Sequence, residues 1–180
     1  SQNIVPSKLP VYFVAWTTTP WTLFANTGLA VGASINYSFV ETINPYSFEK
    51  IVVICAKECL PRFFHVEMEG VSIDGFEKKE VRPGKTPYTI VGSCLGADLV
   101  GLKYEQVLKY VQPLEGADNA FRVVHGDFVN TSDGTGVVHL APTFGSDDFN
   151  LAKKECLPLM MVSRKSKQVP IVDLNGRFVD

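Results

Sequence analysis

Long hydrophobic runs are missing from this 180-residue chain. No apolar stretch approaches the ~20 residues that a helix needs to cross a bilayer. The first seven residues lack the basic-then-apolar order of a signal peptide. We therefore expect no membrane segment and a cytoplasmic location. The chain also lacks an initiator methionine, from which we expect it to be a piece of a longer protein.

An excess of charge of either sign is missing too. The sequence holds 17 Lys and Arg against 19 Asp and Glu, a formal net charge of -2. Proteins that bind duplex nucleic acid neutralise many phosphates and usually carry a basic face. The composition therefore argues against duplex binding, whereas contact with a single-stranded end needs few phosphate contacts and stays allowed.

Cysteine is scarce, and its spacing matches no common metal motif. The four are Cys55, Cys59, Cys94 and Cys156, with no C-x-x-C pair and only His65 near the first two. Reduced, mostly buried thiols are favoured over a zinc site.

The sequence also lacks the H-E-x-x-H, P-loop and G-x-S-x-G motifs. With 46% hydrophobic residues, the chain can form one domain, 1–180, with a core that requires no metal.

The residue patterning predicts a mixed α/β fold, with a curled sheet or partly closed β-barrel and short peripheral helices. Strands are predicted at 9–17 (buried), 28–31, 37–43, 50–55, 88–91, 120–124 and 137–140. Short helices are predicted at 21–24, 57–64, 95–100 and 146–156. The polar stretch 67–85 is predicted to form turns with one short strand. In the last helix Ser146 is the expected N-cap, and Pro158 ends the helix.

Hydroxyl side chains gather where the first predicted strand ends. Thr17, Thr18 and Thr19 precede Pro20, Trp21 and Thr22, and Asn26 follows shortly. Threonine has a high strand propensity, which alone would explain the run. Pro20, however, removes a backbone donor and turns the chain. The turn would expose hydroxyls and amides that can hold an ester carbonyl or a water.

A second polar motif surrounds the strand at 137–140 and the helix that follows it. His139 is expected at the rim of the sheet because Pro142 forces the chain out of the strand; His65 and His125 have no such context. Asp147 and Asp148 lie in the first helical turn, where one carboxylate can stabilise the helix dipole while the other faces a cleft. A triad of Ser146, His139 and an aspartate is disfavoured because Ser146 is already explained as a cap.

Together, these two motifs resemble the editing domain of isoleucyl-tRNA synthetase. This domain, called connective peptide 1, is an insertion in the catalytic core of class I synthetases. The resemblance covers essentially the whole chain. Thr19-Pro20-Trp21 stands where the related valyl and leucyl enzymes carry Arg-Pro-Glu, and residues 143–145 are more similar to the eukaryotic-type enzymes. H-I-G-H and K-M-S-K-S are absent, and 163–167 only superficially echoes the latter, so we expect an excised domain without the aminoacylation site.

The resemblance implies hydrolysis of the ester that joins valine to the 3′ end of tRNA(Ile). Asp148 would pair with the α-ammonium of the substrate, and His139 would form the wall that excludes isoleucine. Trp21 would contribute to the pocket floor. The remaining expected site residues, which would hold the ester and the terminal ribose and position a water, are Thr17, Thr18, Thr19 and Asn26. No metal or other cofactor is implied for editing, since ATP serves only the absent synthetic domain.

The expected partners are the valine-carrying 3′ end of tRNA(Ile) and the rest of the synthetase; the domain itself is expected to be monomeric.

Two residues inside the motifs depart from the family pattern: Phe24 replaces a common proline, and Leu140 replaces a common threonine or glutamine. Two alternatives stay open at this point. One is a non-catalytic tRNA-binding module, and the other is the editing domain of a valyl- or leucyl-tRNA synthetase.

Overall fold

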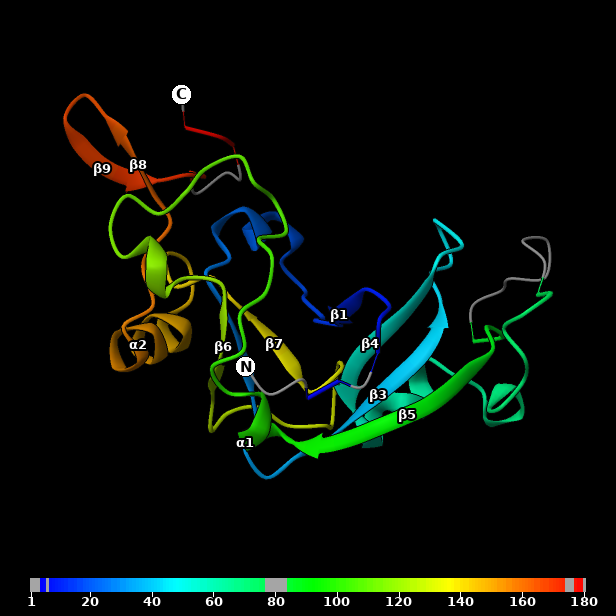
Figure 1. Ribbon diagram of the computed structural model, residues 1–180. Helices are drawn as coiled ribbons and strands as arrows, with labels where there is room; N and C mark the ends of the chain where they lie inside the picture. The colour runs from blue at the N-terminus through cyan, green and yellow to red at the C-terminus, as the bar shows by residue number, and fades with distance from the viewer. Residues whose placement is uncertain (1–3, 6, 77–83, 174–176, 180) are drawn as a thin grey trace.

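The computed structural model describes residues 4–5, 7–76, 84–173 and 177–179 (Figure 1). Its largest sheet has four strands in the order β1-β4-β3-β5. Their bounds are Val11–Phe13 for β1, Asn36–Ile43 for β3, Lys50–Ala56 for β4 and Tyr88–Leu95 for β5. The central strand β3 pairs antiparallel with β4 and β5, and β1 runs parallel to β4 at the edge.

A second sheet of three strands carries the polar motif around His139. Its order is β6-β2-β7, with bounds Arg122–His125, Gly28–Val31 and Val137–Leu140. The middle strand β2 pairs parallel with β6 and antiparallel with β7, and this register places Leu29 opposite His139. A separate hairpin is formed by β8 (Met161–Arg164) and β9 (Lys167–Pro170).

The helices are short and lie at the periphery. In the residues that the structure describes, the 3-10 helices are η1 (Pro20–Ala25), η2 (Lys57–Arg62), η3 (Val66–Met68) and η5 (Ala117–Asn119). The α-helices are α1 (Gly96–Leu99) and α2 (Ser146–Glu155). Within the described ranges, no helix is long and apolar enough to cross a membrane.

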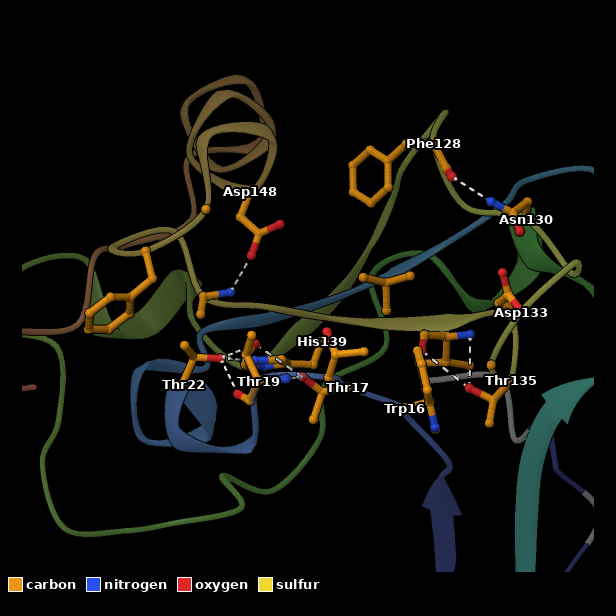
Figure 2. Close-up of a pocket in the computed structure, with 18 of the residues that line it drawn as sticks. Trp16, Thr17, Thr19, Thr22, Phe128, Asn130, Asp133, Thr135, His139 and Asp148 are labelled. Atoms are coloured by element: carbon orange, nitrogen blue, oxygen red, sulfur yellow. Dashed lines mark hydrogen bonds between the residues drawn. The ribbon is translucent and has the colours of Figure 1, made fainter. Parts of the chain in front are cut away.

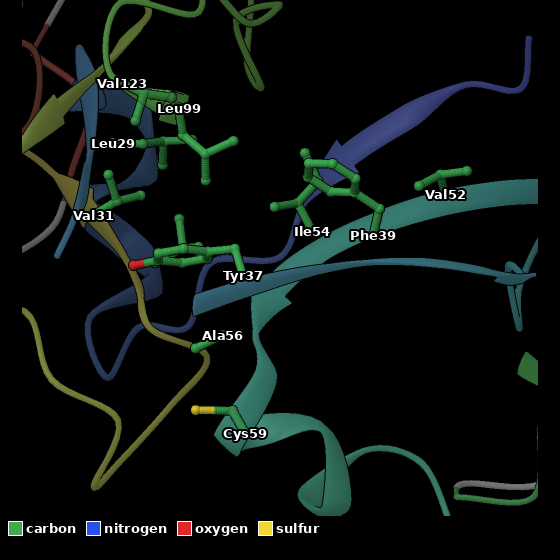
Figure 3. Close-up of a cluster of buried hydrophobic side chains, with 11 residues drawn as sticks. Leu29, Val31, Tyr37, Phe39, Val52, Ile54, Ala56, Cys59, Leu99 and Val123 are labelled. Carbon is green, nitrogen blue, oxygen red and sulfur yellow. The ribbon is translucent and has the colours of Figure 1, made fainter. Parts of the chain in front are cut away.

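The main core fills the space between the two larger sheets (Figure 3). Phe39 and Ile54 enter it from the four-stranded sheet, and Leu29, Val31 and Val123 enter it from the three-stranded sheet. Each is at most 6% exposed, so these apolar side chains are almost fully removed from water. Their burial is the main force that holds the sheets against each other.

Polar and close-packed contacts fix the junction between the sheets. The fully buried Tyr37 of β3 donates its hydroxyl proton to the Gly136 carbonyl at 2.6 Å, and its oxygen accepts from the Gly32 amide at 3.1 Å. A Cβ at Gly96 would lie 2.1 Å from the Gly32 carbonyl oxygen, so only glycine fits there. Gly136 begins the segment that enters β7, and the junction therefore reaches the site-bearing strand directly.

The mixed α/β fold is confirmed, with separate sheets and no closed barrel in the described part of the chain. Most predicted elements are present within a few residues of their expected bounds. The strand predicted at 9–17 is wrong in length and burial: only Val11–Phe13 is a strand, and Tyr12 is 49% exposed because β1 is an edge strand. The N-cap of α2 is Gly145, not Ser146.

One further prediction stays open, and one element was not predicted. The short strand expected within 67–85 is not found in the described part of that stretch, and residues 77–83 lie outside the described ranges. The β8–β9 hairpin was missed because its turn lacks glycine and asparagine. Lys165 and Ser166 instead adopt φ values of 49° and 63°, which are uncommon for such residues.

Candidate functional site

A cleft of about 600 Å³ lies where the two sequence motifs meet (Figure 2). The segment before and within η1 supplies its threonines, and β7 and the start of α2 supply His139 and Asp148. The loop that leads into β7 supplies a further wall. The expected site residues that line this cleft are Thr17, Thr18, Thr19, Trp21, His139 and Asp148. Segments more than a hundred residues apart in sequence therefore form one hollow.

The threonines are ordered by hydrogen bonds to one another and to the backbone. The Thr19 amide donates to Thr17 Oγ1 at 3.0 Å, and the two hydroxyls lie 3.3 Å apart. Thr22 donates its hydroxyl proton to the Thr19 carbonyl at 2.8 Å, and its oxygen lies 3.1 Å from Thr19 Oγ1. Pro20 stands at the start of η1, where its fixed φ suits a helical start and its missing N–H is not needed. The turn therefore holds a fixed hydroxyl cluster beside the cleft.

His139 lies near the end of the edge strand β7 and lines the cleft, with only 7% of its surface exposed. The ring is held on both sides. Nε2 lies 2.9 Å from Thr22 Oγ1, and Nδ1 lies 3.0 Å from Asn26 Nδ2. Burial lowers the pKa of His139, and the Asp148 carboxylate opposes this with a smaller effect. The imidazole is therefore neutral at physiological pH.

Asn26 lies behind His139 and does not line the cleft with the threonines. Its amide nitrogen donates to the Gly28 carbonyl at 2.8 Å and also lies 3.3 Å from the Leu140 carbonyl. Its amide oxygen accepts a hydrogen bond from the Tyr104 hydroxyl at 2.5 Å. Neither Tyr104 nor Thr22 was given a role from the sequence. Tyr104 could not have been found, because no local pattern joins it to Asn26.

Asp148 projects from the first turn of α2 toward the end of β7 (Figure 2). Its carboxylate accepts a hydrogen bond from the Ala141 amide at 2.8 Å. The side chain is partly buried, whereas Asp147 is exposed. Of the two neighbouring carboxylates, only Asp148 lines the cleft. The expected division between a solvent-facing and a cleft-facing aspartate is confirmed.

Aromatic side chains and an acidic loop complete the cleft. Trp16 and Trp21 are 53% and 54% exposed, which places Trp21 at the surface of the cleft and not in a buried floor. Phe128 and Phe144 add apolar surface, and Asp133 adds a second carboxylate. These residues other than Trp21 were not assigned from the sequence. Aromatic rings flanking a polar hollow can contact a planar base or an apolar side chain.

Arg62 of η2 holds the loop of residues 130–134, the strap, which forms one wall of the cleft. Its guanidinium donates to the carbonyls of Thr131 at 2.8 Å, Ser132 at 2.6 Å and Gly134 at 3.0 Å. Gly134 in turn packs beneath the Trp16 ring. One planar cation thus satisfies several carbonyls of an irregular loop, and Arg62 itself does not line the cleft.

Replacing Arg62 with alanine is expected to loosen the strap while leaving the rest of the fold intact. The loss of the charge-assisted hydrogen bonds should cost about 1–2 kcal/mol, a moderate value because the side chain is exposed. Amide hydrogen exchange should rise in residues 131–136 and stay unchanged in α2. Arg62→Lys should give an intermediate result, and Arg164→Ala on the exposed hairpin serves as the matched control. Unchanged exchange in the strap would contradict this role.

The cysteines and other possible ligands do not form a metal centre in the described ranges, where no group of three or more His, Cys, Asp or Glu has suitable geometry. Cys55 and Cys59 are buried free thiols, and burial raises the pKa of Cys55 to about 12. Of the other two histidines, His125 contacts Asp127 at 2.7 Å and His65 lies 3.7 Å from Glu67. Both contacts are partly exposed surface pairs.

Comparison with known proteins identifies the relatives of this chain. It is 45% identical over 168 residues to an isoleucine–tRNA ligase of Cytophaga hutchinsonii and 42% identical over 176 residues to one of Bacteroides thetaiotaomicron. The chain is homologous to a segment of the isoleucine–tRNA ligases. Each alignment covers 93% of this chain and 15% of the relative. An isoleucine–tRNA ligase of Treponema denticola is 37% identical over 99% of this chain. No family model matches.

Solved structures share the fold. The editing domain of the P. falciparum cytosolic leucyl-tRNA synthetase aligns with a TM-score of 0.56 at 15% identity, covering 83% of this chain and 49% of that one. The corresponding P. knowlesi domain gives a TM-score of 0.53 at 14% identity, over 81% of this chain and 52% of that one. The chain therefore shares the fold of these leucyl-tRNA synthetase editing domains.

Proposed function

We propose that this chain is a proofreading domain that hydrolyses the ester of mischarged valyl-tRNA(Ile). The observation that carries the proposal is the placement of Asp148, fixed by the Ala141 amide at the edge of a cleft that also holds the threonine cluster. A carboxylate in that position can anchor the α-ammonium of an aminoacyl group by a charge-assisted contact. Homology to the isoleucine–tRNA ligases supplies the class of substrate.

A second, hydrolytic site is needed because an aminoacylation pocket can discriminate only weakly between isoleucine and valine. A pocket shaped for isoleucine disfavours valine by only ~1–3 kcal/mol, a limit for which isoleucyl-tRNA synthetase is itself the standard example. A smaller hydrolytic pocket can admit valine and exclude isoleucine. In this proposal the buried, hydrogen-bonded His139 forms the wall that sets the size. A ring fixed from both sides cannot move aside for an additional methyl group.

A positioned water is the proposed nucleophile. Among the described residues that line the cleft there is no serine or cysteine. Threonine hydroxyls that already hydrogen-bond one another can orient a water and the ester beside it. Holding the reactants in place supplies much of the rate gain in such a reaction, and polar groups aimed at the developing oxyanion supply the rest. A ribose hydroxyl of the tRNA can assist.

The 3′ end of the tRNA is the part of the substrate that we propose enters the cleft. Both charged side chains that line it, Asp133 and Asp148, are acidic. Such a cleft suits an aminoacyl-adenosine terminus better than a run of phosphates. The exposed rings of Trp16 and Trp21 offer faces for the terminal base. The remaining charge of the tRNA would be met by the rest of the synthetase.

The decisive experiment compares hydrolysis of valyl-tRNA(Ile) and isoleucyl-tRNA(Ile) by this chain. Faster loss of valine is expected. Equal loss of both amino acids would contradict size selection, and preference for a substrate mischarged on tRNA(Val) or tRNA(Leu) would indicate a valyl or leucyl specificity. If neither ester is hydrolysed, binding of a valyl-adenosine analogue decides. Binding that depends on Asp148 keeps the proposed site, whereas its absence leaves only a tRNA-binding module.

A further inference from the structure

The hydrogen bonds around His139 leave little freedom in where the protons lie. Every contact in this group joins atoms whose donor or acceptor character is fixed by chemistry or by a neighbour. The group runs from Asn26 through His139 to Thr22, Thr19 and Thr17. Working outward from the backbone carbonyls, which can only accept, fixes each direction in turn.

The orientation of the Asn26 amide is fixed first. Its Nδ2 lies 2.8 Å from the Gly28 carbonyl and 3.3 Å from the Leu140 carbonyl, and both can only accept. Its Oδ1 lies 2.5 Å from the Tyr104 hydroxyl, which donates to it. The flipped amide would place an oxygen against two carbonyl oxygens. Nδ2 is therefore the atom that faces His139 Nδ1, at 3.0 Å, and Nδ2 can only donate.

The tautomer of His139 follows from both sides of the ring. Asn26 Nδ2 has two protons for three contacts, and the two shorter contacts are to the Gly28 carbonyl at 2.8 Å and to His139 Nδ1 at 3.0 Å. Nδ1 therefore accepts from Asn26 and carries no proton, and the neutral ring holds its proton on Nε2. On the other side, Thr22 has one hydroxyl proton and gives it to the Thr19 carbonyl at 2.8 Å. Its oxygen must then accept from His139 Nε2 at 2.9 Å. The Thr22 contacts agree with the tautomer that the Asn26 amide sets.

The threonine protons are assigned by the same reasoning. Thr22 Oγ1 has given its proton away, so it accepts from Thr19 at 3.1 Å as well as from His139. Thr19 has then used its own proton and accepts from Thr17 at 3.3 Å. Thr17 Oγ1 also accepts from the Thr19 amide. In the free site the hydroxyls of Thr17 and Thr19 have committed their protons, and each keeps one lone pair.

We propose that Asn26 is a positioning residue that holds His139 in the Nε2–H tautomer, so that Thr17 and Thr19 present lone pairs, not protons, to the cleft. This inference rests on the proposed function, in which the hydroxyls of Thr17 and Thr19 position the attacking water. They accept a hydrogen bond from the attacking water and aim its oxygen at the ester carbonyl. They do not stabilise the oxyanion, which must receive its hydrogen bonds from other groups. Asn26 acts through His139 and does not touch the substrate.

Nitrogen NMR of the histidine rings tests this without any hydrolysis assay. In ¹⁵N-labelled protein of this sequence, His139 should show an unprotonated Nδ1 and a protonated Nε2 at neutral pH. His139→Gln identifies its signals among the three histidines. A proton on Nδ1, or on both nitrogens, would overturn the proposal. Because the free protein is measured, this result is independent of whether valyl-tRNA(Ile) is the substrate.

Two variants separate the role of Asn26 from that of Thr22. Thr22→Val removes the partner of Nε2 and should leave the tautomer unchanged, because Asn26 still donates to Nδ1. Asn26→Ala removes that donor, and the ring should become a mixture of both tautomers. The opposite pattern, with Thr22→Val changing the tautomer and Asn26→Ala preserving it, would refute the assignment to Asn26. Should Asn26→Ala not fold, the wild-type spectrum and Thr22→Val still decide.

Discussion

Replacing Asp148 with asparagine is expected to reduce hydrolysis of valyl-tRNA(Ile) by roughly 10²–10³-fold, the effect of losing ~3–4 kcal/mol from one charge-assisted contact. Asparagine keeps the size of the side chain, and its amide oxygen can still accept from the Ala141 amide that Asp148 accepts from at 2.8 Å. The loop at the end of β7 therefore stays in place. What is lost is the negative charge that would pair with the α-ammonium of the aminoacyl group.

Asp147→Asn is the matched control for this prediction. The two aspartates are neighbours in the first turn of α2, so both interact with the same helix dipole, but Asp147 is exposed and does not line the cleft. Its replacement should change stability by only ~0.3–1 kcal/mol and leave hydrolysis nearly unaffected. If the two variants lost activity equally, or if Asp148→Asn stayed within a few-fold of wild type, Asp148 would not be the anchor.

The sequence predicted a strand correctly where an apolar run is also buried on both faces in the structure. The strand β2 begins and ends at the predicted residues because Gly28–Val31 is apolar throughout and buried. The strand expected at 9–17 failed for the opposite reason. An apolar, β-branched run indicates a strand, but it does not say whether the strand lies in the centre or at the edge of a sheet. Here only Val11–Phe13 is a strand, and its position at the edge of the sheet leaves Val11 and Tyr12 exposed.

The sequence placed the site residues that local turns and helix starts position, but it did not predict the contacts between residues far apart in the chain. The positions of Thr19 and Asp148 follow from the turn at Pro20 and the start of α2, which are local features. The contacts of Asn26 with Tyr104, and of Arg62 with the strap, join residues 78 and about 70 positions apart. No local sequence pattern indicates that residues so far apart are in contact. Such partners become visible only when the sheets are assembled.

Replacing Tyr37 with phenylalanine is expected to lower the free energy of unfolding by about 2–4 kcal/mol, because two buried backbone groups lose their partner. The hydroxyl donates to the Gly136 carbonyl at 2.6 Å and accepts from the Gly32 amide at 3.1 Å, in a side chain with no exposed surface. Burial raises the pKa of Tyr37 to about 12. The hydroxyl therefore keeps its proton for the Gly136 carbonyl throughout the neutral range.

Urea denaturation of the wild type, Tyr37→Phe and Tyr12→Phe measures this effect. Tyr12 is 49% exposed on the edge strand, so removing its hydroxyl should change stability by less than about 0.5 kcal/mol. Equal stability of the two variants would show that the Tyr37 hydroxyl does not hold the sheets together.

The Tyr37→Phe variant also tests how the fold supports the cleft, since Gly136 leads into β7 and itself lines the cleft. In folded Tyr37→Phe protein, binding of a valyl-adenosine analogue should weaken, because the wall that carries Thr135 and Gly136 has lost its anchor to β3.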